Sequence, residues 1–330
     1  MQKEELKLIN MEDIETEKVR WLMKPFIAFR KVTIIEGNPG EGKTTMMLYL
    51  IAAMTKGEPL TAGRKENWTD ESEEDTETCK SMTVLYQTAE DGLADTIKPR
   101  LVAAGADCSK VLVIDDTDRA LTMMDSRLEA ALEKTDASLV VLDPIQGYLG
   151  AQVDINRANE IRPVMKHLAG LAEKYGCAIV LIGHMNKCMG AGNAAYRGLG
   201  SIDFQAAARS VILVGRVKDD PEIRVVCQVK SSLAPESTPI AFRLSRERGF
   251  EWIGEYEITV DELLMGEPKG KKLKEAKEFL MEVLANGQKA ETEIADLADK
   301  QGIRSRTLRK AKSEINADAT KVGNKWYWML

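Results

Sequence analysis

Between residue 32 and about residue 230, short apolar runs alternate with longer stretches of helical pattern. Several of the runs are apolar on both faces, which is typical of strands buried in a parallel sheet. The predicted strands cover residues 32–36, 82–88, 111–115, 138–143, 178–183, 210–215 and 224–229. Helical stretches between them include 43–57 and 158–176, each ended by a glycine. This alternation predicts an α/β fold built on a doubly wound, mainly parallel sheet.

Two segments interrupt the alternation. Residues 66–77 form an acidic run without apolar periodicity, which predicts a solvated loop, with binding of a partner as the alternative. Residues 265–275 are rich in Gly, Pro and Lys and predict a linker. We therefore expect a first domain over 1–264, of which 1–19 are a lead-in, then the linker, and a second domain over 276–330.

The composition is that of an ordinary globular protein. Of 330 residues, 44% are apolar and 30% charged, and the formal net charge of -6 excludes a uniformly basic surface. The five cysteines are widely spaced, without a Cys-x-x-Cys pair, so we expect reduced thiols and neither a disulfide framework nor a zinc site. No apolar run reaches the length of a membrane span, and the first ten residues lack an apolar core. These features predict a cytoplasmic protein without a membrane partner.

The stretch "EGNPGEGKTT" at residues 36–45 lies between a predicted strand and a predicted helix. It fits the pattern G-x-x-x-x-G-K-[ST], in which backbone N–H groups and the helix N-terminus surround phosphate oxygens. We expect Lys43 to reach the β- and γ-phosphates of ATP and the Thr44 hydroxyl to bind Mg²⁺. An incidental glycine-rich turn is the alternative, which the strand and helix on either side disfavour. The predicted nucleotide-binding residues are Gly37, Asn38, Pro39, Gly40, Glu41, Gly42, Lys43, Thr44 and Thr45.

Carboxylates follow two other predicted strands. Asp143 ends the run "SLVVLD" and is the expected second ligand of Mg²⁺. The next residue is Pro144, so a carboxylate that orients the attacking water must come from elsewhere. Glu90 and Asp91 follow the strand at 82–88 and would lie on the ligand-binding edge of the sheet. The alternative is that both acids cap the helix that begins near Gly92.

Polar residues also follow the strand at 178–183. His184 there either contacts the γ-phosphate or the attacking water, or has a structural role like the one we assign to His167. The glycine-rich stretch after it carries Lys187 and Arg197. These residues predict a loop that follows a single-stranded DNA backbone, with a plain flexible loop as the alternative.

The last 55 residues predict three helices followed by a two-stranded wing. The third helix, near 304–315, carries Arg304, Arg306, Arg309 and Lys310, and no acid precedes Glu314. This pattern is typical of a winged helix-turn-helix whose basic helix binds DNA. A small packing module with a solvated basic face is the alternative.

These motifs together resemble the RecA-type ATPases of the RepA-like group, which are hexameric replicative helicases and related proteins of mobile elements. The resemblance covers residues 20 to about 245 and is carried by "WLMKPFIAFRKVTIIEGNPGEGKTT", "VLYQTAEDG", "VVLDPIQGYLG", "IVLIGHMNK", "YRGLGS" and "QVKSSLAP". It implies a RecA-like fold in which Glu90 is the catalytic glutamate and His184 a sensor of the nucleotide. It also implies that Lys230 acts on the γ-phosphate of a neighbouring subunit.

Related helicases often have an arginine two residues after that lysine, where this chain has Ser232. A trans-acting arginine would then come from Arg209 or Arg216, unless the site uses Lys230 alone. The expected function is that of a DNA-dependent, Mg²⁺-dependent ATPase, a ring helicase that forms a homo-oligomer, most simply a hexamer. The alternative is a nucleotide-gated DNA-binding regulator that does not unwind DNA. A small-molecule kinase is disfavoured by the basic tail and by the lack of an obvious lid over an acceptor.

Overall fold

The computed structural model describes the chain except for a set of short segments. These are residues 1–7, 61, 63–79, 151–152, 156, 186–201, 219, 246, 266–270, 286, 302, 304, 316 and 323–324. The chain forms two compact units, which are described separately. The first comprises Met1–Gly215 and Glu222–Tyr256, and the second comprises Arg216–Pro221 and Glu257–Leu330.

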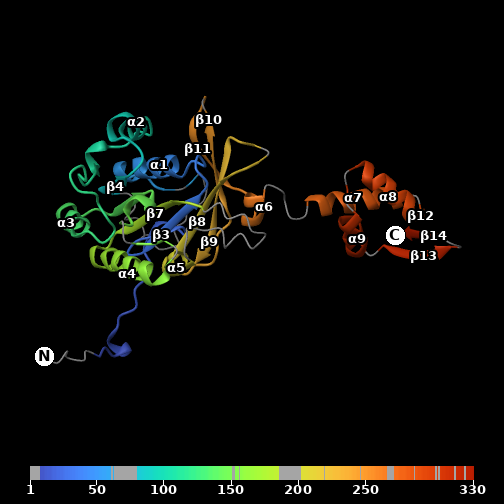
Figure 1. The fold of residues 1–330 in the computed structure, drawn as a ribbon, viewed down its shortest axis with the longest axis horizontal. Helices are drawn as coiled ribbons and strands as arrows, with labels where there is room; N and C mark the ends of the chain where they lie inside the picture. The colour runs from blue at the N-terminus through green and yellow to red at the C-terminus, as the bar shows by residue number, and fades with distance from the viewer. Residues whose placement is uncertain are drawn as a thin grey trace. The chain divides into compact units, whose positions relative to one another are not determined.

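The first unit is built on a large, mostly parallel sheet (Figure 1). In the described residues its order is β11-β10-β9-β8-β3-β7-β6-β4-β5. The pairs from β8 to β5 are parallel, and β10 pairs antiparallel with β9 and β11. The strands are β3 (Val32–Gly37), β4 (Val84–Thr88), β5 (Val111–Leu112), β6 (Leu139–Asp143), β7 (Ala178–His184), β8 (Ser210–Arg216), β9 (Ile223–Ser231), β10 (Ile240–Ser245) and β11 (Gly249–Glu255). The predicted α/β class with a mainly parallel sheet is confirmed.

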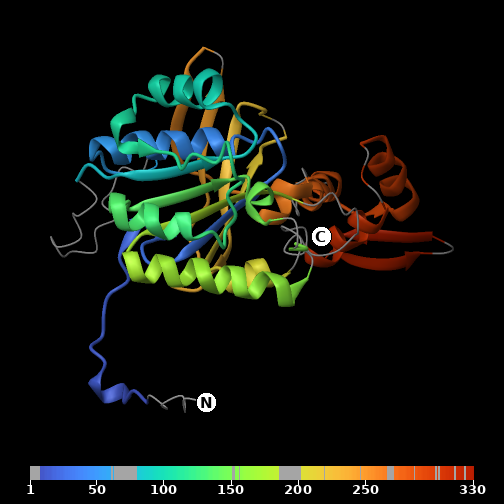
Figure 2. The same cartoon turned by 60° about the vertical axis from the view of Figure 1, so that its left-hand side comes forward.

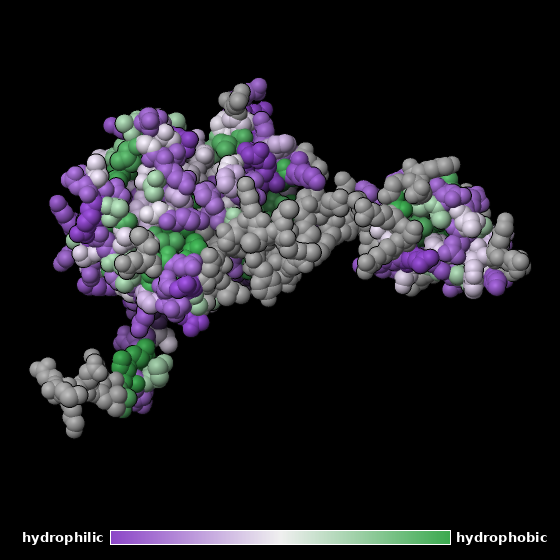
Figure 3. All heavy atoms as spheres, in the orientation of Figure 1, coloured by the Kyte–Doolittle hydropathy of each residue, from purple (hydrophilic) through white to green (hydrophobic). Residues whose placement is uncertain are grey.

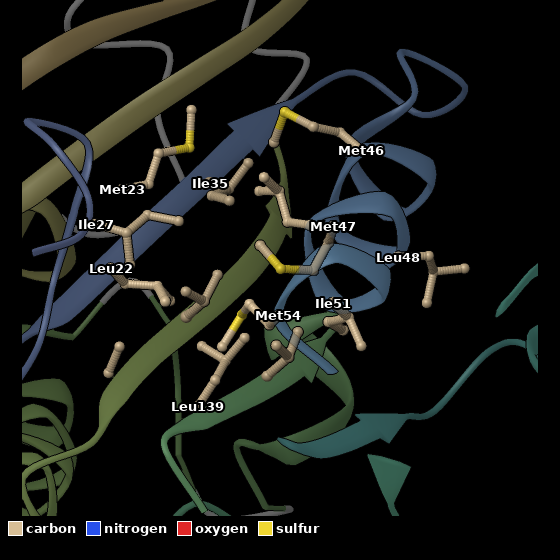
Figure 4. Close-up of a cluster of buried hydrophobic side chains, with 14 of the residues drawn as sticks. Leu22, Met23, Ile27, Ile35, Met46, Met47, Leu48, Ile51, Met54 and Leu139 are labelled. Atoms are coloured by element: carbon tan, nitrogen blue, oxygen red, sulfur yellow. The ribbon is translucent and has the colours of Figure 1, made fainter. Parts of the chain in front are cut away.

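Helices cover both faces of this sheet (Figure 2). The helices are α1 (Lys43–Lys56), α2 (Lys98–Ala103), α3 (Ser126–Thr135), α4 (Ala158–Tyr175) and α5 (Ile202–Ala207). Successive side chains of a strand point to opposite faces, so Ile35 packs with α1 whereas Ile34 packs with α4. Figure 4 shows the first of these two cores, in which methionines of α1 fill the space above β3 and β6. Sheet positions buried on both sides explain why the strands read as continuous apolar runs.

Both predicted helix ends are confirmed. Gly57 ends α1 and Gly176 ends α4, each in the left-handed region, at φ of 71° and 68°. A residue without Cβ adopts this conformation at little cost, which is why glycine commonly ends helices.

Two parts of the sheet differ from the prediction. The strand expected over 111–115 forms only at Val111–Leu112, because β5 is the edge strand and the chain then turns where Asp115 accepts hydrogen bonds from Thr117. The antiparallel hairpin of β10 and β11 was not predicted. Neither was the short pair of β1 (Trp21–Met23) and β2 (Ile27–Ala28) that leads into β3.

The second unit has its own small core. It contains α6 (Val260–Met265), α7 (Lys271–Leu284), β12 (Lys289–Ala290), α8 (Glu291–Lys300), α9 (Ser305–Glu314), β13 (Asp318–Val322) and β14 (Lys325–Met329). The strands pair antiparallel in the order β12-β14-β13. Leu280, Ile294, Leu308 and Trp328 are among the buried residues that join the three longer helices to this sheet. The predicted linker over 265–275 is wrong at its end, because Lys271 already begins α7 in a run of good helix formers.

Candidate phosphate and metal site

The phosphate loop connects β3 to α1 and depends on two glycines. Gly42 precedes α1 at a φ of 89°, a conformation that side chains with Cβ rarely adopt. A Cβ on Gly37 would lie 2.1 Å from the carbonyl oxygen of Val214 in β8. The loop therefore leaves β3 in direct contact with the backbone of β8, and only a glycine at position 37 leaves room for this.

The Lys43 side chain closes this loop. It is 4% exposed, and its Nζ donates hydrogen bonds of 2.9 Å to the carbonyl oxygens of Gly37 and Asn38. Burial lowers the pKa of the Lys43 ammonium, and nearby carboxylates, of which Asp143 is the strongest, act in the opposite direction. An ammonium held among carbonyl oxygens can exchange these partners for the oxygens of a polyphosphate, which carry more negative charge.

Thr44 and Asp143 meet beside the loop. The Thr44 hydroxyl donates a 2.6 Å hydrogen bond to Oδ2 of Asp143, which is 6% exposed at the end of β6. Burial raises the pKa of the Asp143 carboxyl, whereas hydrogen bonds from Thr44 and Tyr86 lower it. Two hard oxygen donors at the open edge of the sheet can take part in binding Mg²⁺.

The Thr44 hydroxyl and the Asp143 carboxylate suit Mg²⁺ better than a metal ion that takes all of its ligands from protein side chains. Among the described residues, no group of three or more His, Cys, Asp or Glu side chains is placed to hold a metal ion. Mg²⁺ retains several waters and commonly takes one or two protein ligands together with phosphate oxygens. Thr44 and Asp143 match that requirement. When bound with the nucleotide, Mg²⁺ would neutralise charge on the phosphate oxygens.

Tyr86 is a site residue that the sequence analysis missed. It is fully buried in β4, and its hydroxyl donates a 3.0 Å hydrogen bond to the same Oδ2 of Asp143. Burial, and after it the charge of Asp143, raises the pKa of Tyr86 well above its ordinary value, so the hydroxyl remains a donor. A tyrosine inside a strand predicted to be buried was the available signal, because a buried hydroxyl needs a partner.

Glu90 and His184 lie together on the same edge of the sheet. Oε2 of Glu90 is 3.6 Å from Nε2 of His184, and Nδ1 of the same ring is 3.4 Å from Nζ of Lys43. The imidazole therefore links the carboxylate to the phosphate-loop lysine. The Glu90 side chain is 62% exposed, which leaves it open to a water molecule and a substrate.

Glu90 and Asp91 differ in their contacts. Both come just before Gly92, the residue that precedes the π-helical turn at Leu93–Ile97, and the alternative that they favour the start of that turn stays open. Asp91 pairs with Arg100 of α2 at 3.4 Å. Of the two predicted acids, Glu90 is the one that contacts His184, the residue next to Lys43 of the phosphate loop.

Lys230 has a different environment. Its Nζ donates to the carbonyl oxygens of Gln205, Ala206 and Ala208, at 2.7–2.9 Å, and so caps the C-terminal end of α5. Burial lowers the pKa of Lys230, and the charge of Arg209 adds to this effect. Its predicted action on a neighbouring subunit stays a prediction.

The predicted DNA-binding residues fall into two sets. Lys187, Arg197 and Arg304 lie outside the described residues, as does the side chain of Arg306. Arg309 and Lys310 are exposed on α9, while Leu308 and Ala311 of the same helix face the core. Arg309 and Lys310 therefore lie on the solvent side of α9, where phosphate contacts require them.

Residues 2–190 match the family described as an AAA domain, which is more than half of the 330 residues. The chain belongs to this family. Membership and the phosphate-loop geometry together identify a P-loop ATPase. The comparison with curated proteins finds no match.

Two solved structures are similar to this AAA domain protein. The ATPase domain of G40P has 13% sequence identity and a TM-score of 0.48, with 70% of this chain and 85% of that chain covered. The RadB recombinase has 18% identity and a TM-score of 0.47, with 70% of this chain and 93% of that chain covered. No described helix is both long and apolar enough to cross a membrane.

Proposed function

We propose that the protein is a DNA-dependent, Mg²⁺-dependent ATPase of RecA-like fold that forms a ring and acts as a replicative helicase of a mobile element. The observation that carries the proposal is the chain of contacts from Glu90 through His184 to Lys43. Through these contacts the solvent-exposed carboxylate of Glu90 lies near Lys43, the residue proposed to hold the phosphates. Hydrolysis needs a proton acceptor for water close to the γ-phosphate. The sequence resemblance to RepA-like helicases supports the assignment of DNA as the activating partner.

The roles follow from position. Lys43 and the backbone of the loop bind the triphosphate, and Thr44 with Asp143 holds Mg²⁺. Glu90 accepts the proton of the attacking water, and His184 adjusts the position of Glu90 to the presence of the γ-phosphate. Single-stranded DNA binds in the ring, and the winged helix-turn-helix formed by α7 to β14 binds duplex DNA through Arg309 and Lys310.

Turnover with and without DNA tests this proposal. The wild-type protein should hydrolyse ATP faster with single-stranded DNA and should displace a paired strand in an unwinding assay. Lys43→Ala should lose nucleotide binding, because the phosphates lose their charged partner. DNA that leaves the ATPase rate unchanged would contradict the proposal, even if basal hydrolysis is measurable.

The assembly is tested by mixing variants. We propose that Lys230 leaves the end of α5 to act on the γ-phosphate in the neighbouring subunit. Lys230→Ala and Glu90→Gln should each be inactive, and their mixture should recover part of the activity at sites that combine both intact groups. Nucleotide binding by each variant alone is the control for folding. Full activity of the wild type as a dilute monomer would contradict a shared site.

One observation favours a second function, that of a nucleotide-gated DNA-binding regulator. Ser232 occupies the position of the expected arginine, and Lys230 is bound by carbonyl groups of its own chain. A trans-acting arginine accounts for about 10³–10⁵-fold of the rate in related P-loop enzymes. DNA-stimulated hydrolysis without strand displacement would select this second function.

A further inference from the structure

Glu36 is a carboxylate inside the first unit. On the face drawn in Figure 3, hydrophilic residues cover much of the surface of this unit, whereas Glu36 is only 2% exposed. It lies in β3 directly before Gly37, whose carbonyl oxygen accepts a hydrogen bond from Nζ of Lys43. A buried carboxylate requires hydrogen-bond donors in place of water, so its donors indicate which parts of the molecule it joins.

Gln205 of α5 is such a donor. Its Nε2 lies 3.0 Å and 3.2 Å from the two carboxylate oxygens of Glu36, although the residues are 169 positions apart in sequence. Hydrogen bonds to a carboxylate are stronger than those between neutral groups. The preceding residue, Phe204, is fully buried in the core that also contains residues of α4. Helix α5 is therefore attached to the unit both by an apolar side chain and by the bond to Glu36.

The backbone of α5 holds Lys230. Nζ of Lys230 donates to the carbonyl oxygen of Gln205 at 2.8 Å and to those of Ala206 and Ala208 at 2.7 Å and 2.9 Å. Three carbonyl oxygens converge on one ammonium only while the end of the helix keeps its shape. Gln205 thus makes two contacts at once, because its side chain binds Glu36 and its carbonyl oxygen binds Lys230.

We propose that Gln205 is a positioning residue, whose hydrogen bond to Glu36 keeps the end of α5 in the shape that retains Lys230 within its own chain. The inference rests on the proposed action of Lys230 on the γ-phosphate of a neighbouring subunit, and it names what restrains that action. Lys230 must leave the α5 carbonyls to reach that phosphate. A contact that stabilises the retained arrangement therefore lowers the population of the active one.

Hydrolysis without DNA tests the restraint. Gln205→Met keeps the length of the side chain and removes the donor, so the basal ATPase rate should rise several-fold as more Lys230 side chains become free to act. Ala207→Met is the matched control, because it places the same side chain at an exposed position of the same helix. A purely structural role would lower the rate or leave it unchanged. Either result, or an equal rise in the control, would overturn the proposal.

Changes at Glu36 separate the hydrogen bond from other effects. Glu36→Leu removes the acceptor and should raise the basal rate as Gln205→Met does, whereas Glu36→Gln keeps an oxygen that accepts from Gln205 and should retain most of the restraint. The double variant Glu36→Leu with Gln205→Met should show no further rise, because both changes remove the same contact. Binding of an ATP analogue by each variant is the control for an intact phosphate loop. Additive rises would overturn the proposal.

The rise must also depend on Lys230. Adding Lys230→Ala to Gln205→Met should abolish the gain in rate, because the residue that the contact restrains is then missing. A gain that persists without Lys230 would overturn the positioning role of Gln205.

Hydrogen exchange observes the end of α5 without catalysis. The N–H of Ala208 donates to the carbonyl oxygen of Phe204, and that of Arg209 donates to the carbonyl oxygen of Val32. In protein without nucleotide, Gln205→Met should speed the exchange of these two amides several-fold, because the end of the helix opens more often. Exchange in α3 should be unchanged and serves as the reference. Equal exchange at Ala208 and Arg209 in both proteins would overturn the proposal.

The positioning role and the proposed function can fail separately. DNA that leaves the wild-type rate unchanged would contradict the proposed function, while a rise in Gln205→Met that depends on Lys230 would still support the restraint. DNA-stimulated hydrolysis combined with wild-type behaviour of Gln205→Met would do the reverse.

Discussion

The phosphate site of the first unit and helix α9 of the second unit use polar side chains in opposite ways. At the phosphate site, Lys43, Asp143 and Tyr86 are buried and bond to one another or to the backbone. On α9, Arg309 and Lys310 are exposed above a small apolar core. Burial strengthens each interaction of the first set and makes each loss costly, whereas solvent and salt weaken the second set.

The difference predicts how the two regions respond to substitution. At the phosphate site, single changes should have large effects that depend on geometry. On α9, effects should be small, additive and sensitive to salt. The predictions below test this contrast, beginning with the largest expected effect.

Glu90→Gln should bind ATP and lose about 10²–10⁴-fold in turnover, because the amide cannot accept the proton of the attacking water. Single-turnover hydrolysis and nucleotide binding, measured separately, check this. Asp91→Asn is the control, since its carboxylate pairs with Arg100. A similar loss in both variants would remove the special role of Glu90.

Tyr86→Phe should raise the Mg²⁺ concentration needed for half-maximal turnover by about 10-fold, because residues that orient a metal ligand typically contribute this much. Binding of Mn²⁺ by the protein without nucleotide gives an independent measurement. Tyr148→Phe is the matched control, because the Tyr148 hydroxyl is buried without a hydrogen-bond partner among the described residues. An unchanged metal requirement in Tyr86→Phe would show that its hydroxyl is only structural.

Arg309→Ala and Lys310→Ala should each weaken DNA binding by a few-fold and reduce the slope of log K against log salt by about one. Titration of duplex DNA at several salt concentrations measures both quantities. Lys134→Ala, an exposed lysine of α3, is the control. If the salt slope were the same in all three variants, α9 would be a packing element with a solvated basic face.

Asp125→Asn should destabilise the first unit by about 1 kcal/mol at pH 7, because a charged cap is replaced by a neutral one. Hydrogen bonds from Arg127 hold the pKa of the Asp125 carboxyl well below its ordinary value. The carboxylate therefore stabilises the fold above its unfolded pKa of about 4, and this stabilisation is lost as pH falls through the lowered pKa.

Denaturant unfolding of both proteins from pH 7 to pH 3 measures this difference, which should narrow as the solution becomes acidic. Asp118→Asn, an exposed acid in the preceding loop, is the control. A difference that is constant with pH would show that the charge of Asp125 contributes nothing to stability.

The sequence alone determined the features that depend on local pattern. The alternation of apolar runs and helices predicted most of the parallel strands, and the glycines at 57 and 176 predicted two helix ends. The phosphate-loop pattern and the strand-end acids Asp143 and Glu90 could also be read directly, because parallel strands bring their carboxyl ends to one edge. Each of these inferences requires only residues that are near in sequence or placed by strand direction.

Only the tertiary structure decided which of these groups touch. The bond from Tyr86 to Asp143, the link from Glu90 through His184 to Lys43, and the binding of Lys230 by α5 join residues that are far apart in sequence. The hairpin of β10 and β11 likewise forms by pairing on β9 rather than by a strong local signal. Such contacts depend on strand order and on which side chains are buried together, and the local pattern of a single sequence specifies neither.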